Sequence, residues 1–208
     1  MPLNLKTAAH SVLISLSLAT AASAGALGDP IIEKPLELIE EPDWQGFRLG
    51  LTYNGEMSGN TTAASEGFPF LDAGHDNDGN LGGFVGFDLQ RGQMVYGLEY
   101  QHIQRDSAVQ GDPSRVHGDI SSLRVRIGRT AGKTLFYGSI GAAQSTFDDA
   151  GTNIDMDGYV AGIGIERLFG KNGILGLAVD HYDLSGERLA TTVESKHTVL
   201  QLRVGFKF

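Results

Sequence analysis

The last ten residues of the chain, Val199–Phe208, read VLQLRVGFKF, and their polarity alternates. One register holds only apolar side chains, namely Leu200, Leu202, Val204, Phe206 and Phe208. The other register holds Val199, Gln201, Arg203, Gly205 and Lys207. A period of two over this length predicts a β-strand with one apolar face and one polar face.

Seven earlier segments have the same period, so we predict an all-β protein. In seven of the eight segments, one face carries large aliphatic and aromatic residues and the other carries glycines and charged residues. The exception is KTLFYGSIGAA, residues 133–143, whose two faces do not differ clearly in polarity. The eight segments are 44–53, 80–90, 93–101, 122–128, 133–143, 158–168, 174–182 and 199–208.

The connections between these segments alternate in length. Short connections lie near Arg91, Ala131 and Lys171. The other connections are long and polar, at about 55–80, 104–117, 148–157 and 184–197. Short turns at one end and long loops at the other are typical of bacterial outer-membrane barrels. We therefore predict an eight-stranded antiparallel up-and-down transmembrane β-barrel with strands of about nine to eleven residues.

A soluble β-protein is the competing architecture, and the content of the two faces separates the alternatives. A soluble sheet exposes its charged face to water, whereas here the charged face is rich in glycine and fits a narrow lumen. Large apolar side chains on the other face fit lipid. Buried charges require partners, so we predict a paired network in the lumen. Its candidate members are Arg48, Asp88, Glu99, Arg124, Arg126, Glu166, Asp180, Arg203 and Lys207.

The N-terminal residues differ from the rest of the chain. Residues 1–24 carry Lys6, a short apolar run and the end Ala22-Ser23-Ala24, which predicts a cleaved signal peptide and export. Residues 25–43 are acidic and contain prolines, so we predict a flexible periplasmic leader. The barrel domain would then occupy 44–208. The 208-residue chain has a net charge of −9 and no cysteine, which argues against a nucleic-acid partner and excludes cysteine-based metal sites.

Two motifs at the ends of the predicted barrel resemble a known group. Trp44-Gln45-Gly46-Phe47, continued to Gly50, is similar to the opening of small porin-family and opacity-like outer-membrane proteins. The apolar series ending at Phe208 resembles the signal that their assembly machinery reads during insertion. The resemblance covers Trp44–Phe208 and implies an architecture like the OmpA transmembrane domain and OmpX.

From these features we predict a monomeric structural and interaction protein of the bacterial outer membrane, without enzyme activity or a cofactor. It would contribute to envelope integrity and to surface interactions through its long extracellular loops. Expected partners are membrane lipids, lipopolysaccharide and the assembly machinery, with a loop ligand or peptidoglycan left open. The alternatives are a narrow or gated pore and, less favoured, a lipid A-modifying enzyme. The best catalytic candidates are Asp180, His181, Asp183 and Ser185. On a strand, His181 and Ser185 would be about 13 Å apart, too far for a hydrogen bond.

Two acidic stretches raise the question of metal binding. Asp72–Asn80 is rich in glycine and acid but does not fit the EF-hand spacing. A second loop carries Asp148, Asp149, Asp155 and Asp157. We predict solvated loops without a dedicated metal site. Loose divalent-cation bridging to lipopolysaccharide phosphates is the alternative.

Overall fold

The computed structural model describes residues 42–65, 68–74, 79–105, 107–109, 112–149, 151–188 and 191–208. The signal peptide 1–24 and nearly all of the leader 25–43 lie outside these residues, so both remain predictions. Every described strand belongs to the compact unit Glu40–Phe208. Within the described part of the chain, no helix is long and apolar enough to cross a membrane.

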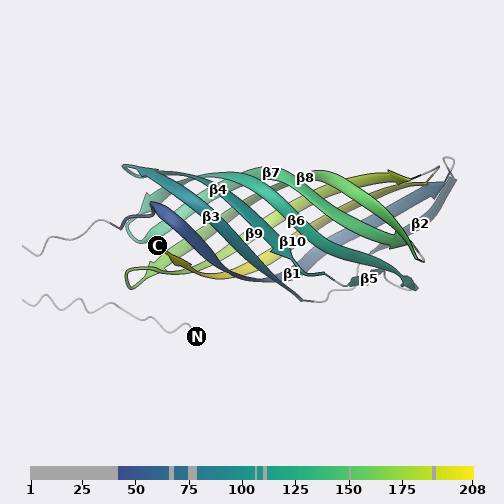
Figure 1. Cartoon of the computed structure of the whole chain (residues 1–208), viewed down its shortest axis with the longest axis horizontal. Helices are drawn as coiled ribbons and strands as arrows, with labels where there is room; N and C mark the ends of the chain where they lie inside the picture. Colours follow the sequence, from purple (N-terminus) through teal and green to yellow (C-terminus); the bar gives the residue numbers. More distant parts are fainter. Residues whose placement is uncertain are drawn as a thin grey trace, which may run out of the picture. The chain divides into compact units, whose positions relative to one another are not determined.

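Ten antiparallel strands form one sheet, and eight of them close into a ring (Figure 1). The ring order is β1-β3-β4-β6-β7-β8-β9-β10, and β10 pairs with β1 to close it. This confirms the predicted eight-stranded up-and-down barrel. The short strands β2 and β5 pair with β1 and β6 outside the ring order. The bounds are β1 Gly46–Ser65, β2 Phe68–Gly74, β3 Asn80–Arg91, β4 Met94–Ile103, β5 Ser107–Val109, β6 Asp112–Ala131, β7 Thr134–Asp149, β8 Thr152–Phe169, β9 Gly173–Arg188 and β10 Thr191–Lys207.

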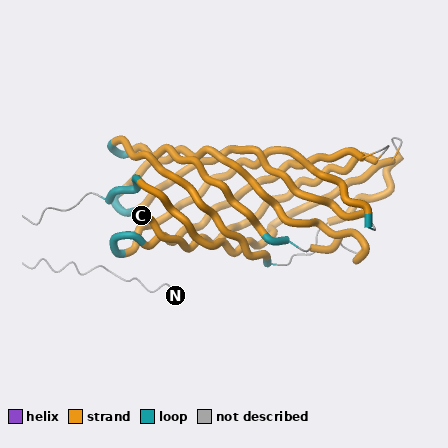
Figure 2. The backbone as a smooth tube through the Cα atoms, viewed as in Figure 1, coloured by secondary structure: helices purple, strands orange, loops and turns teal. Residues whose placement is uncertain are grey.

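The three short turns and the C-terminus lie at the same end of the barrel, which we call the turn end (Figure 2). Each turn contains a glycine with positive φ: Gly92 (58°), Gly132 (57°) and Gly170 (59°). Glycine adopts this conformation without steric cost, and so permits tight reversals of the chain. The predicted short connections are confirmed. We call the opposite end, where β2 and β5 lie, the projecting end.

The ring closes at the turn end through the two termini of the barrel. The backbone N–H of Phe208 donates to the carbonyl oxygen of Phe47 at 2.8 Å. Gly46 has φ 129°, and a Cβ at this position would collide with the carbonyl oxygen of Phe208. Gly46 in the W-x-G motif is therefore required by the close approach of the two ends of the ring.

The apolar face points outward. In all seven segments whose two faces were predicted to differ, the face with the large apolar residues lies on the outside and the face with the glycines and charged residues lies on the inside. On β10, for example, Leu202 is 44% exposed whereas Arg203 is 1% exposed. The structure also assigns the two faces of β7, which the sequence left open: Leu135 and Tyr137 face inward and Phe136 faces outward. Exposed aromatic residues bound the apolar face at both ends. At the turn end they are Phe47, Tyr96, Phe136, Phe169, Phe206 and Phe208, and toward the projecting end they are Tyr53, Tyr100 and Tyr159.

The distance between these two aromatic belts matches a membrane. Tyr159 and Phe169 mark them on β8 and are ten residues apart. With about 3.3 Å per residue and a tilt of about 40°, this separation corresponds to about 25 Å along the barrel axis. That is the height of the apolar band expected for an outer-membrane barrel.

The prediction of long polar loops is largely wrong, because most of these residues continue the strands. β1 runs to Ser65 and β10 begins at Thr191, so ring strands reach 20 residues instead of nine to eleven. Beyond the aromatic belt the polarity reverses: Val193 of β10 is fully buried, and its neighbour Glu194 is exposed. The projecting part thus has a mainly apolar interior, which also encloses Thr61, His117, Ser195 and His197, and a polar exterior, as expected for a sheet in water.

Candidate functional site

A closed ring of ion pairs crosses the interior between the two aromatic belts. Arg48 lies 3.0 Å from Asp88 and 2.7 Å from Glu99, with contacts in ion-pair rather than hydrogen-bond geometry. The remaining links are Arg126–Asp88 at 2.7 Å, Arg126–Glu166 at 2.9 Å, Arg203–Glu166 at 3.1 Å and Arg203–Glu99 at 2.6 Å. Three arginines and three carboxylates therefore alternate around a complete cycle.

A fourth pair is attached to this cycle. Arg124 donates to Asp180 at 2.6 Å and lies 3.8 Å from Glu99. Its guanidinium also donates to Gln101, to Ser122 at 2.9 Å and to Tyr182 at 3.2 Å. All three neutral partners surround Nη2 of this buried guanidinium, whereas Nε makes no hydrogen bond and faces the carboxylate of Glu99.

Aromatic rings complete the network. Arg126 lies over the ring of Tyr137 at 4.7 Å, and Arg203 lies over the ring of Phe84 at 4.2 Å. Such cation–π contacts are strongest when the cation is desolvated. With Tyr137 on β7, every strand of the ring supplies a side chain to the network.

Glycines on the inner face provide the space for these side chains. A Cβ at Gly97 would collide with Asp88 and lie 2.8 Å from Cγ of Arg126. A Cβ at Gly162 would collide with the carboxylate of Asp180. The high glycine content of the inner register is thus explained by close packing around the ion pairs.

The structure brings together eight of the nine predicted lumen residues, and none of the eight is more than 3% exposed. Lys207 is the exception: its ammonium group donates to the carbonyl of Gln45 at 2.9 Å and lies 3.5 Å from Asp43. It has the inward register but lies at the turn end, beyond the network. Without Lys207, four arginines face four carboxylates, so the network is formally neutral.

Apolar layers lie on both sides of the network. At the turn end, Trp44 is 1% exposed and packs in a cluster with Val95, Tyr137 and Leu135 among others. Toward the projecting end, a larger cluster contains Ile103, Ile120, Ala143, Phe147, Ile154, Met156, Val160, Tyr182, Leu184, Val193 and Val199. The charged lumen is therefore limited to the middle layer, although the layer toward the projecting end also contains the buried polar side chains of Thr61, His117, Ser195 and His197. The two flanking layers resemble the core of a soluble protein.

No protein-family model matches the chain. The 25 kDa outer-membrane immunogenic protein of Brucella canis is 28% identical, over 98% of this chain and 99% of that protein. The 22 kDa outer membrane protein of Rhizobium leguminosarum bv. viciae is 31% identical over 126 residues, which are 51% of this chain and 58% of that protein. The crystal structure of OprG from Pseudomonas aeruginosa has the same fold, with a TM-score of 0.54 at 14% identity, and covers 79% of this chain and 96% of OprG.

The chain is an outer-membrane β-barrel protein. Short turns are periplasmic in such barrels, so the turn end faces the periplasm and the projecting end faces the exterior. The predicted assembly-signal residues Leu200, Leu202, Val204, Phe206 and Phe208 all point outward along β10. Phe206 and Phe208 contact each other, with ring centroids 5.1 Å apart, in the periplasmic aromatic belt.

The structure separates the four candidate catalytic residues. Asp180 is buried against Arg124 inside the barrel, whereas His181 and Ser185 are exposed outside. Nδ1 of His181 lies 3.0 Å from Oγ1 of Thr198, and Asp183 accepts from the hydroxyl of Tyr159 at 3.3 Å. No nucleophile, base and acid therefore meet among these four residues.

The acidic stretches are only partly described. Residues 75–78 of the stretch Asp72–Asn80 lie outside the described residues, as does the side chain of Asp149. Asp148 caps its turn by accepting from the N–H of Gly151 at 2.6 Å. Asp155 and Asp157 are exposed on the outer surface of β8. Among the described side chains, no group of three or more acids and histidines could hold a metal ion.

Several members of the network were absent from the predicted set. Gln101 and Gln201 have the inward register, and Gln201 accepts from Arg203 at 3.1 Å, but neither carries a charge. Their position in the inward register is the sequence feature that could have identified them as members of the network. Tyr137 could not be assigned, because both registers of β7 are apolar near the periplasmic end.

Proposed function

We propose that the protein is a monomeric, non-conducting barrel without enzyme activity, which supports the outer membrane and presents a surface for interactions outside the cell. The observation that carries this proposal is the neutral cycle of buried ion pairs between two apolar layers. Eight strands enclose an interior that side chains can fill, and these side chains interlock across it. Water and solutes would have to break several buried ion pairs to pass.

The projecting strands support the second half of the proposal. β1 continues twelve residues beyond Tyr53 of the outer aromatic belt, about 30 Å along the axis at the same rise and tilt. The outer side of this projection carries exposed Asp155, Asp157 and Glu194. A largely polar surface of this height is accessible to molecules at the cell surface. The Brucella relatives are named immunogenic proteins, which is consistent with such a surface in this chain.

The absence of enzyme activity is part of the proposal. His181 and Asp180 are adjacent in sequence but lie on opposite sides of the barrel wall, so they cannot form one catalytic site.

Solute flux through the purified full-length protein tests the proposal. The protein is reconstituted in liposomes, and swelling is measured with sugars and amino acids, with a known porin as the positive control. We expect no swelling above protein-free liposomes. Swelling that increases with the amount of protein would refute the non-conducting barrel. Proteolysis of intact cells tests the projection. A protease added outside the cells should cleave only in the projecting part of the barrel, which lies on the outer side of the aromatic belt that contains Tyr53.

A further inference from the structure

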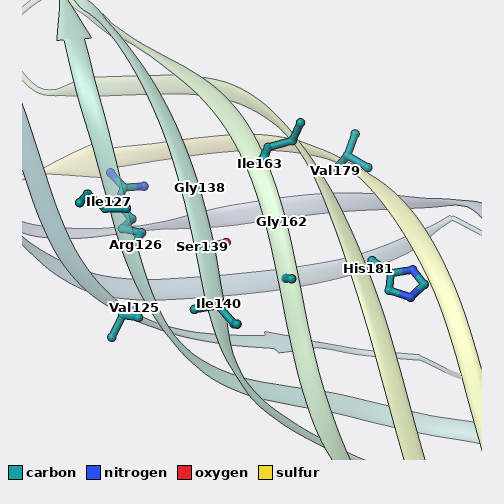
Figure 3. A pocket seen from close by; sticks show the side chains of 11 residues that line it. Val125, Arg126, Ile127, Gly138, Ser139, Ile140, Gly162, Ile163, Val179 and His181 are labelled. Carbon is teal, nitrogen blue, oxygen red and sulfur yellow. The ribbon is translucent and has the colours of Figure 1, made fainter.

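A groove crosses the outer apolar face over β6, β7, β8 and β9 (Figure 3). Its outer part has a volume of about 500 Å³, and its walls include Val125, Ile140, Ile163, Val179 and His181. A second part of about 570 Å³ continues toward the periplasm past Phe136, Ile165 and Leu177. Both parts share Ile127, Gly138, Ile163 and Val179, so they form one continuous groove.

The floor of the groove is low because two outward positions carry small residues. Gly138 pairs with Ile163, and Ala161 pairs with Ile140, which is 58% exposed. A Cβ at Gly138 would have its nearest neighbour, the carbonyl oxygen of Gly162, at 3.8 Å, an ordinary contact. In contrast, a Cβ at the inward Gly162 would collide with Asp180. Barrel packing therefore requires glycine at position 162 but not at position 138.

Polar side chains close the outer end of the groove. His181 follows the apolar run of β9, and its Nδ1 lies 3.0 Å from Oγ1 of Thr198. Two residues further toward the projecting end on β9 and β10, Lys196 lies 3.4 Å from Asp183, so this pair carries no net charge. From Leu177 to His181 the groove follows four residues of β9, about 13 Å at the usual rise. It thus begins at the outer polar boundary and ends within the apolar band.

We propose that this groove binds one acyl chain of an outer-leaflet lipid, with the ester or amide linkage of the chain hydrogen-bonded to His181. The groove lies between the aromatic belts, where lipid chains cover the barrel. His181 lies where the apolar band ends, at the depth of the linkage between acyl chain and headgroup. Because Lys196 and Asp183 together carry no net charge, they add no surplus positive charge that would attract a free phosphate to this rim.

Groove-filling substitutions test the site without disturbing the core. Gly138→Leu and Ala161→Leu each place a side chain in the groove, and His181→Leu removes the polar anchor. Gly83→Leu is the matched control, because Gly83 has the outward register on β3 and room for a Cβ, with the nearest atom at 3.5 Å. Native mass spectrometry of the full-length protein in detergent counts bound lipid during titration with lipid A, or with dipalmitoyl phosphatidylethanolamine. The heat-dependent gel shift of each variant verifies that it is folded.

We expect one lipid A to bind tightly to the wild type and to Gly83→Leu. Lost packing in the groove should weaken binding by about tenfold in either filled variant, and His181→Leu should weaken it severalfold. Equal lipid A binding by the wild type and both filled variants would refute acyl-chain binding in the groove. Unchanged binding by His181→Leu would refute the hydrogen bond between His181 and the lipid linkage. Equally tight phospholipid binding would overturn the outer-leaflet assignment. A dimer mass without lipid would show that a second copy occupies the groove instead.

Discussion

Replacing Glu99 with alanine removes the carboxylate that three arginines share. Arg203 lies 2.6 Å from it, Arg48 lies 2.7 Å from it, and Arg124 lies 3.8 Å from it. Each arginine keeps another carboxylate, namely Glu166 at 3.1 Å, Asp88 at 3.0 Å and Asp180 at 2.6 Å. The variant therefore leaves no arginine without a partner, but the interior gains one net positive charge.

Breaking a buried ion pair by removing one partner costs about 3–5 kcal/mol. Because the three arginines retain partners, we expect Glu99→Ala to lower the free energy of unfolding by about 3 kcal/mol, the lower end of this range. Combining Glu99→Leu with Arg203→Met restores neutrality and fills the space with apolar atoms. This double variant should recover about 2 kcal/mol of the loss, since apolar replacements of buried ion pairs are often tolerated.

Urea unfolding in phospholipid vesicles measures these values. Trp44 is the single tryptophan, and it is buried at the periplasmic end, so its fluorescence reports loss of the barrel. Glu194→Ala, an exposed carboxylate on β10, is the control and should change the stability by less than about 0.5 kcal/mol. The reasoning is wrong if Glu99→Ala is as stable as this control, or if the neutral double variant is less stable than Glu99→Ala.

Three further predictions concern the lipid face, assembly and the periplasmic layer. Leu202→Arg should cost about 2–4 kcal/mol in the same unfolding assay, whereas Met57→Arg, outward but beyond the outer aromatic belt, should cost almost nothing; equal costs would contradict the membrane boundaries. Phe208→Ala should lower the amount of folded protein in the outer membrane and increase periplasmic degradation, and unchanged levels in cell fractions would refute the assembly-signal hypothesis. Trp44→Ala should destabilise the barrel by about 3 kcal/mol, measured as a lower temperature for the gel-mobility shift, because it leaves a cavity at the periplasmic end. An unchanged transition temperature would show that Trp44 does not seal that end.

The barrel was predictable because the membrane enforces a contrast between its two faces. Where lipid contacts the outside and ion pairs occupy the inside, alternation is clear, as at Leu202 and Arg203. β7 gave no such contrast, because Leu135 and Tyr137 face an apolar interior layer while Phe136 faces lipid.

The projecting strands were missed because the same alternation has the opposite meaning there. In the segment around Ile154, apolar residues point inward and Asp155 and Asp157 point outward, so the charges resemble those of a loop. Register irregularities add to the difficulty. The shift between Glu56 and Ser58 moves the inward positions of β1 from even to odd residue numbers.

The ion-pair network was predictable as a set of residues but not as a connected cycle. Alternation assigns Arg48 and Glu166 to the interior, but it gives no information on which residues lie at the same height. That information comes from the stagger between strands, which places residues distant in sequence side by side. Lys207 has the correct register and still lies outside the network, because its height places it at the periplasmic rim.

Single-channel recording in planar lipid bilayers is the most direct test of the closed interior. We predict that the wild-type protein, inserted in its folded form, gives no sustained conductance. Glu99→Ala provides the comparison, because an interior with unbalanced arginines can admit ions through small, brief openings. Sustained large-conductance openings of the wild type would contradict the account, because they require a continuous water column through the ion-pair network and both apolar layers.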